Sequence, residues 1–484
     1  MKPAFPEAVA LVLFRRDLRL NDHPALSAAA QSGARIIPVY VLDDETPGNW
    51  RMGGASRWWL AQSLRSLRNN LERAGSRLIL RRGETGRALR DLAQETGASA
   101  VYFTRGYEPF QRRLEERIRV ALPEAGVECR RFGGQILIEP EKLSNARGEP
   151  FRVFSPFYRA LAQHAPPAPL PAPGALPPPA SWPWPEDLES WGLEPSKPDW
   201  AGGIRAAWTP GEDEAHKRLR VFIETAIKTY KGQRNKPGGD FTSRLSPYLA
   251  AGEISPRQIW HTVLDAAEAA GEPGLGEAFL REVAWREFSY HLLFHFPDLP
   301  EKAFKPEFAR FPFQENKHAL QSWQKGLTGY PIVDAGMRQL WQTGWMHNRV
   351  RMIVASFLIK HLLVPWQEGE AWFWDTLVDA DLANNSASWQ WVAGSGADAA
   401  PYFRIFNPVL QGEKFDPEGD YVRAYCPELA MLPNSLIHKP WEGEAGLLQH
   451  SGVTLGVTYP RPIVAHQEAR QRALAAFEGI KKQV

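Results

Sequence analysis

The strongest constraint in this sequence is a change of hydrophobic pattern partway along its 484 residues. In the first third, short apolar runs of strand length alternate with stretches of helical periodicity. Strands that alternate with helices predict a parallel sheet covered on both faces, whose ligands bind beyond the carboxyl ends of the strands. No G-x-G-x-x-G motif follows the first run, so a nicotinamide-type site is disfavoured. The predicted strands are residues 9–14, 36–42, 78–80, 100–103 and 128–132, and the predicted helices between them are 24–32, 55–74, 87–96 and 109–121.

The pattern changes after a proline- and alanine-rich stretch at residues 165–185. Proline fixes φ and lacks a backbone donor, so this stretch is expected to be an extended connector across the surface between two domains. From Gly211 onward almost every segment has helical periodicity. The sequence therefore predicts an α/β domain with a doubly wound parallel sheet over 1–135, a connector over 136–210 and a large all-α domain over 211–484. Predicted helices in the last part include 212–230, 255–270, 277–294, 332–343, 350–362 and 370–379.

Composition excludes several classes of protein. The formal net charge of +2 neither requires nor excludes a nucleic-acid partner. Cys129 and Cys426 are too few for a disulfide framework, a cysteine-rich zinc site or an iron–sulfur cluster, and we expect no metal. The first residues do not resemble a signal peptide, and no apolar run reaches the roughly 18 residues that span a bilayer. We expect a cytoplasmic protein without a membrane partner.

The helical half contains polar and aromatic clusters that core packing alone does not require. Residues 242–247 (TSRLSP) offer hydroxyls and backbone donors before a helix start, which suits either a phosphate site or an ordinary helix cap. Glu282 and Trp285 are three residues apart and share a helix face, either as a binding pair or as part of an amphipathic helix.

Two further clusters have complementary charges. Residues 345–352 (WMHNRVRM) place two arginines and an asparagine among apolar residues, where they need acidic or ligand partners if they are buried. Residues 379–391 (DADLANNSASWQW) supply two carboxylates, two amides and two indoles. A surface loop with helix caps would also explain the second segment, but the number of matched groups favours a binding site.

Together these motifs resemble the photolyase/cryptochrome family, and specifically its bacterial photolyases for cyclobutane pyrimidine dimers; both the class I and the class III branch fit. The resemblance covers nearly the whole chain. The matching segments are residues 14–22 (FRRDLRLND), 242–247, 285–288, 328–334 (TGYPIVD), 344–352, 379–391 and 402–408 (YFRIFNP).

The resemblance implies a non-covalent FAD, working as FADH⁻, in the helical domain. Arg351 and Asp379 match a salt-bridged pair along the flavin ring, and Asp381 matches a carboxylate that contacts it. Asn385 matches the residue that faces flavin N5, where plant-type cryptochromes usually have an aspartate. The other matched cofactor positions are Tyr230, Thr242, Ser243, Arg244, Leu245, Ser246 and Ala380.

The resemblance also implies DNA that contains cyclobutane pyrimidine dimers as the partner. A dimer must be flipped out of the duplex to be reached. Trp285 and Trp391 match the indoles that sandwich it, and Glu282 matches the carboxyl that bonds its 5′ base. Seven lysines and arginines against one glutamate between Lys217 and Lys236 agree with a phosphate-facing strip. Asn348 and Met352 match further dimer contacts, and Arg234, Arg349 and Gln411 match DNA contacts.

Two features depart from the family pattern. Trp389 and Trp366 match the first two residues of a three-tryptophan electron-transfer chain, but the third position is Phe313. Either the chain ends elsewhere, through Trp372, Trp374 or a tyrosine, or photoreduction is slow. The Asn–Glu pair that often binds an antenna folate is replaced by Phe110 and Gln111. Methenyltetrahydrofolate bound in another mode is the favoured antenna, and a deazaflavin is the alternative.

The function that the resemblance implies is that of a deoxyribodipyrimidine photo-lyase, a carbon–carbon lyase driven by blue light. We expect a monomer, associated with the bacterial nucleoid and without a protein partner. The alternative is a cryptochrome-like photoreceptor without repair activity. Asn385 and the intact set of Glu282, Trp285 and Trp391 favour repair.

Overall fold

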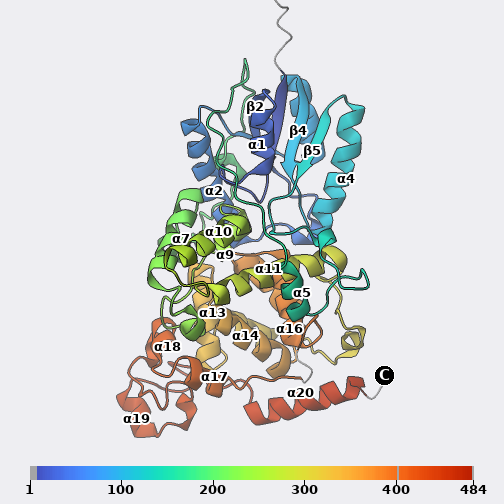
Figure 1. The fold of residues 1–484 in the computed structure, drawn as a ribbon. Coiled ribbons are helices and arrows are strands. Elements are labelled where there is room, and N and C mark those ends of the chain that lie inside the picture. The colour runs from blue at the N-terminus through green and yellow to red at the C-terminus, as the bar shows by residue number, and fades with distance from the viewer. Residues whose placement is uncertain (1–7, 400–402, 482–484) are drawn as a thin grey trace, which may run out of the picture. The chain divides into compact units, whose positions relative to one another are not determined.

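Five parallel strands form the sheet that the alternating pattern predicts, in the order β3-β2-β1-β4-β5 (Figure 1). The computed structural model describes residues 8–399 and 403–481. Every predicted strand is present, and the boundaries differ by a few residues at most. The strands are β1 (Val9–Phe14), β2 (Arg35–Leu42), β3 (Ile79–Arg82), β4 (Ala98–Thr104) and β5 (Glu128–Phe132).

Helices cover both faces of this sheet, so the prediction of a doubly wound α/β fold is confirmed. Alternate residues of β1 point to opposite sides: Val12 belongs to a core shared with α1 (Pro24–Gln31) and α2 (Gly54–Arg73). Its neighbour Leu13 belongs to the core shared with α3 (Thr85–Thr96) and α4 (Pro109–Glu124). Burial on both faces explains why β1, β2 and β4 read as nearly continuous apolar runs.

The proline-rich stretch is extended, as predicted, but it packs against the sheet. The Ile36 N–H donates to Pro177 O at 2.8 Å and the Glu186 N–H donates to Leu80 O at 3.1 Å. Leu176 is buried in the core beside α1 and α2. The stretch thus covers unpaired edges of β2 and β3, which would otherwise expose free backbone groups.

The chain divides into two compact units, and the division does not follow a single point in the sequence. The sheet-containing unit comprises residues 1–201, 208–225 and 243–297, and the helical unit comprises 202–207, 226–242 and 298–484. The helices of the first unit beyond the sheet are α5 (Phe154–Leu161), α7 (Glu212–Thr225), α9 (Ser246–Ala251), α10 (Pro256–Ala269) and α11 (Glu277–His295).

The helical unit contains the remaining helices of the described residues. The segment predicted as one helix over 350–362 is α14 (Asn348–Ser356) followed by a π-helical turn, Phe357–His361. The predicted helix 370–379 begins earlier, after Pro365, as α15 (Trp366–Thr376). In the sheet-containing unit, the predicted helix 212–230 ends earlier, as α7 at Thr225. The other helices are α6 (Gly202–Ala207), α8 (Tyr230–Gln233), α12 (Lys317–Gln324), α13 (Pro331–Thr343), α16 (Leu382–Ala393), α17 (Pro408–Phe415), α18 (Asp420–Tyr425), α19 (Ala445–His450) and α20 (His466–Lys481).

Candidate functional site

The helical unit brings Arg351 and Asp379 together as the ion pair that the sequence predicts. Arg351 lies on α14, and its Nη2 donates to Asp379 Oδ2 at 2.7 Å. Its Nε donates to Met346 O at 2.7 Å, which fixes the plane of the guanidinium. The Asp379 side chain is 2% exposed against 24% for Arg351. The pair is therefore anchored in the core at its acidic end and reaches partial exposure at its basic end.

The Asp379 carboxylate retains capacity for a further donor. Its Oδ1 is buried and accepts no hydrogen bond within the described residues. A buried carboxylate oxygen without a donor is costly, so a bound N–H or O–H group would relieve it. This orphaned oxygen is the local feature that fits a polar ligand such as a flavin. Ala380, which follows Asp379, is also buried.

Asp381 and Asn385 are fixed by the start of α16. Asp381 is the N-cap residue, and its Oδ1 accepts the Asn384 N–H at 2.9 Å. Asn385 lies one turn into the helix and is buried; its Nδ2 donates to Glu370 O at 3.0 Å. Asn385 on α16 and Arg351 on α14 lie on neighbouring helices, because α16 packs against both α14 and α15. Asp379 lies in the turn that joins α15 to α16.

Glu370 is a buried residue of this region that sequence reasoning missed. It lies on α15, and its carboxyl accepts the Ser386 hydroxyl proton at 2.5 Å, while its carbonyl holds Asn385. Burial raises the pKa of Glu370 to about 8, although the hydrogen bond from Ser386 opposes the shift. Glu370 therefore holds its proton near neutral pH. The sequence signal was weak, since a glutamate in a helix is usually solvent-facing.

The start of α14 presents the expected dimer and DNA contacts. Asn348 is exposed, whereas Arg349 and Met352 are half-buried. Trp391, near the end of α16, is also half-buried, and its Nε1 donates to Asp398 O at 3.1 Å. This hydrogen bond fixes the indole edge and leaves part of its surface accessible, as a stacking platform requires.

Trp389 is buried against α15 at Gly369. A Cβ at Gly369 would lie 2.1 Å from Trp389 Cη2, so only glycine permits this close approach. Trp366 is also buried and lies one helical turn before Gly369 on α15. Trp389 makes edge contacts with Phe373 and Trp323, at 5.0 and 6.2 Å between ring centroids. Trp389 thus belongs to an aromatic cluster with Phe373 and Trp323, and Trp366 is buried at the start of the helix against which Trp389 packs.

The third relay position, Phe313, lies among phenylalanines. Its ring centroid is 4.8 Å from that of Phe311. Another indole pair is available one turn beyond Gly369: Trp372 stacks on Trp341 with centroids 6.1 Å apart and an interplanar angle of 7°. Trp341 is 56% exposed, so this pair reaches solvent.

In the sheet-containing unit, Glu282 and Trp285 share a half-buried face of α11, as their spacing predicts. Phe154 of α5 stacks on the Trp285 indole with centroids 3.7 Å apart and an interplanar angle of 7°. Phe288 packs against the same indole edge-on, at 5.9 Å. These contacts cover one face of the Trp285 ring and fix its orientation. No sequence pattern indicates Phe154, because the contact joins segments far apart in the chain.

The predicted phosphate segment ends, as expected, in a helix start with proline in the first turn: α9 begins at Ser246, and Pro247 follows. Arg244 has φ 48°, an uncommon conformation for a residue with a side chain. The Leu245 N–H donates to Ser243 Oγ at 3.4 Å, Leu245 is buried and Ser246 is exposed. Within the helical unit, Thr242 is half-buried, and the buried Tyr230 ring lies 5.9 Å from the Arg234 guanidinium carbon. Gln411 is half-buried on α17.

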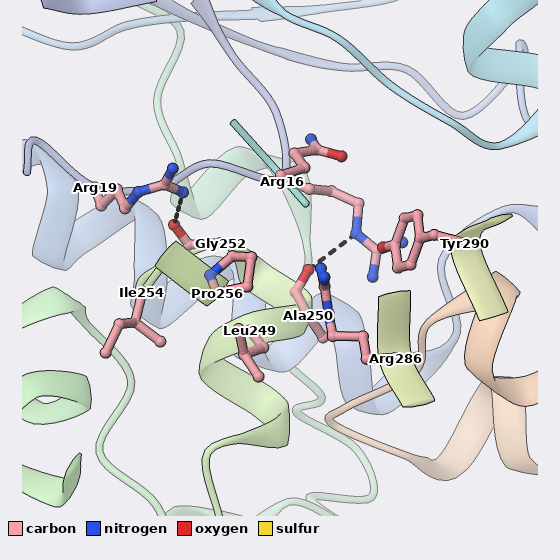
Figure 2. A pocket seen from close by; sticks show the side chains of 10 residues that line it. Arg16, Arg19, Leu249, Ala250, Gly252, Ile254, Pro256, Arg286 and Tyr290 are labelled. Carbon is pink, nitrogen blue, oxygen red and sulfur yellow. Dashed lines mark hydrogen bonds between the residues drawn. The ribbon is translucent and has the colours of Figure 1, made fainter. Parts of the chain in front are cut away.

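Figure 2 shows a small cavity of the sheet-containing unit, which arginines surround. Arg16 Nε donates to Ala250 O and Arg19 Nη1 donates to Gly252 O, each at 2.9 Å. The cavity volume of about 10 Å³ accommodates roughly one water molecule. The cavity is therefore structural and far too small for a chromophore.

The two side chains that replace the antenna-binding pair, Phe110 and Gln111, make contacts within the protein. Phe110 is buried, and Gln111 accepts a hydrogen bond from Arg15. Arg15 also pairs with the buried Glu115 at 2.6 Å and bonds to Thr104 O at the end of β4. The carboxyl ends of β1 and β4, where ligands of such folds often bind, thus carry a charged network centred on Arg15.

Two family models match the chain: one described as DNA photolyase over residues 10–174, and one described as the FAD binding domain of DNA photolyase over residues 279–479. A deoxyribodipyrimidine photo-lyase of Agrobacterium fabrum is 51% identical over 98% of both chains. Cryptochrome-2 of Arabidopsis thaliana is 40% identical over 95% of this chain and 77% of its own length. The crystal structure of a class III photolyase from Agrobacterium tumefaciens matches with a TM-score of 0.95 and 51% identity, covering 100% of this chain and 99% of the other.

A doubly wound sheet domain, followed by helices that carry an Arg–Asp pair and a buried amide, thus defines a flavoprotein of the photolyase type. The chain belongs to the photolyase/cryptochrome family. Within the described residues, no helix combines the length and apolarity needed to cross a bilayer, and no three His, Cys, Asp or Glu side chains gather as a metal site.

Proposed function

We propose that the protein is a deoxyribodipyrimidine photo-lyase, which uses blue light and reduced FAD to split cyclobutane pyrimidine dimers in DNA. The observation that carries the proposal is the buried Asn385 on α16, beside helices that hold the Arg351–Asp379 pair. An amide adds no negative charge there, so an anionic reduced flavin is not repelled. The full-length similarity to the Agrobacterium fabrum photo-lyase supports the same function.

When bound, reduced FAD would supply electron-transfer chemistry that consumes no net reductant. The protein's own residues bind the flavin and the dimer, orient them toward each other and exclude water. In the helical unit we assign flavin contacts to Asp379, through its unfilled Oδ1, and to Arg351 and Asn385. The remaining assignments are Tyr230, Thr242, Ala380 and Asp381 in the helical unit and Ser243, Arg244, Leu245 and Ser246 in the sheet-containing unit.

The dimer is bound by aromatic and polar side chains after it leaves the duplex. Trp285, whose orientation Phe154 fixes, and Trp391, whose edge Asp398 holds, provide the stacking surfaces. Glu282 lies one helical turn from Trp285 and donates or accepts at the base edge. Asn348 and Met352 add dimer contacts, and Arg234, Arg349 and Gln411 contact the DNA backbone.

The class III branch is the better assignment within the family, because the Agrobacterium tumefaciens class III photolyase matches over the full chain. We propose methenyltetrahydrofolate as the antenna, bound in a mode that does not use Phe110 and Gln111, with a deazaflavin as the alternative. The engagement of Gln111 by Arg15 supports this choice. DNA as substrate implies association with the nucleoid, and we propose that the protein acts as a monomer.

Repair of defined lesions tests the function. The holoprotein is mixed with a duplex carrying one cyclobutane thymine dimer, or one (6-4) product, under blue light and in the dark. We expect light-dependent loss of the cyclobutane dimer alone. A protein that binds FAD and changes its absorption under blue light, yet repairs neither lesion even when its flavin is reduced beforehand, would instead be a cryptochrome-like photoreceptor.

A further inference from the structure

Phe415, the last residue of α17, lies close to two cations. The Arg349 guanidinium carbon is 4.5 Å from the centroid of the Phe415 ring, and Lys414 Nζ is 5.4 Å from the same centroid. Arg349 comes from α14, and both α14 and α17 pack against α13 in the helical unit (Figure 1). One half-buried aromatic ring therefore draws cations from two helices to one place.

A neutral side chain fixes the arginine of this group. Asn235 Oδ1 accepts hydrogen bonds from Arg349 Nη2 at 3.0 Å and from Arg349 Nε at 3.3 Å. An aspartate in the same position would make similar contacts but would cancel the positive charge. The amide holds the guanidinium in place and preserves its charge.

The lysine of the group keeps its charge available for another reason. Within the described residues, no carboxylate lies within 4 Å of Lys414 Nζ. The adjacent acid, Glu413, pairs instead with Lys439 at 3.2 Å. The carboxylate of Asp416, on the other side of Phe415, is buried and accepts the backbone N–H groups of Tyr421 and Val422 at 3.0 and 3.1 Å.

Two cations on one ring repel each other unless an anion joins them. Since both lie near the same centroid, they are at most about 10 Å apart, which is comparable to the screening length at about 0.1 M salt. A phosphate group removes the repulsion and satisfies donors on both cations. We propose that Phe415 and Asn235 are positioning residues that hold Arg349 and Lys414 as a paired binding site for a phosphodiester of the DNA backbone. This inference rests on the proposed function, which supplies DNA as the partner.

The salt dependence of DNA binding tests the inference. A fluorescein-labelled duplex with one cyclobutane dimer is titrated with holoprotein in the dark at several salt concentrations. Replacing Lys414 by glutamine removes one phosphate contact. The negative slope of log K against log salt should then become shallower by about 0.9. Phe415→Leu removes no charge, yet we expect it to make this slope shallower by about 1 as well. We also expect it to weaken binding roughly tenfold at low salt. Asn235→Asp is expected to make the slope shallower by about 0.9, because the new carboxylate neutralises Arg349.

A matched control separates this role from general packing. Phe477 lies 4.4 Å from Lys481 Nζ on α20, so Phe477→Leu removes the same type of contact elsewhere in the unit and should leave the slope unchanged. In the Phe415→Leu background, Lys414→Gln should have less than its full effect.

An unchanged slope in Phe415→Leu, or full additivity of the two substitutions, would overturn the inference. Should Phe415→Leu fail to fold, an unchanged slope in Asn235→Asp would overturn it equally. Failure of the unmodified protein to bind the duplex at all would count against the proposed function instead.

Discussion

Because Glu370 is protonated in the folded protein, we expect the free energy of unfolding to depend on pH. Its carboxyl is buried between α15 and α16, and its pKa is raised from 4.5 to about 8 by burial. The folded protein therefore keeps this proton over a pH range in which the unfolded chain has already lost it. The resulting contribution to stability is fully present below about pH 4.5 and is lost as pH rises through 8.

Replacing Glu370 by glutamine removes this dependence, because the amide stays neutral at every pH. Each pH unit between the two pKa values costs the folded protein up to about 1.4 kcal/mol relative to the variant. Over the whole range the difference is on the order of 5 kcal/mol, of which about 4 kcal/mol falls between pH 5 and 8. For a chain of 484 residues that unfolds as a whole or in two parts, this corresponds to roughly 1–2 °C in melting temperature per kcal/mol.

The assay is thermal unfolding of holoprotein in excess FAD, at pH values from 5 to 9. We expect the melting temperature of Glu370→Gln to rise relative to the unmodified protein by about 4–8 °C between pH 5 and 8, and then to level off. Glu368→Gln, an exposed position on the same helix, is the control and should show no such trend. A difference that stays constant from pH 5 to 8 would refute the argument that Glu370 is protonated in the folded protein.

Three further predictions concern the site itself. Asp379→Asn should weaken FAD binding by about tenfold or more, because Arg351 loses its charged partner; ultrafiltration with absorbance of retained flavin measures this, and unchanged retention would contradict it. Trp389→Phe should slow flavin reduction by light and thiol by about tenfold or more, with repair by chemically reduced protein preserved, and Trp372→Phe should slow it less. Glu282→Ala should lower the repair yield per absorbed photon several-fold while dimer affinity falls by less; equal losses of both would assign Glu282 to binding alone.

Hydrophobic periodicity predicted the elements of this fold well, because β1, β2 and β4 are buried on both faces and amphipathic helices such as α3 are buried on one. It failed where the backbone departs from regular geometry. The π-helical turn at 357–361 continues an apolar pattern that reads as ordinary helix. The start of α15 lies at Trp366, in a tryptophan-rich segment whose periodicity is unclear.

The candidate site was predictable where the family resemblance points to particular residues, as in the Arg351–Asp379 pair. It was not predictable where a residue acts through tertiary contacts. Phe154 stacks on Trp285 across a long separation in sequence, and Phe415 receives Arg349 from another helix. Glu370 resembles a solvent-facing residue until its burial is known. Such supporting residues depend on packing, which single-sequence patterns do not encode.

In the proposed reaction, light drives dimer cleavage with reduced FAD as the only reactive group. The most direct measurement is the number of cyclobutane dimers restored per flavin, under anaerobic conditions, with chemically reduced holoprotein and excess damaged duplex, in blue light and in darkness. We expect many dimers restored per flavin in light, none in darkness, and flavin still reduced at the end, because the electron returns after each turnover. No more than one dimer per flavin, with the flavin oxidised in step, would contradict it, since the electron would then be consumed.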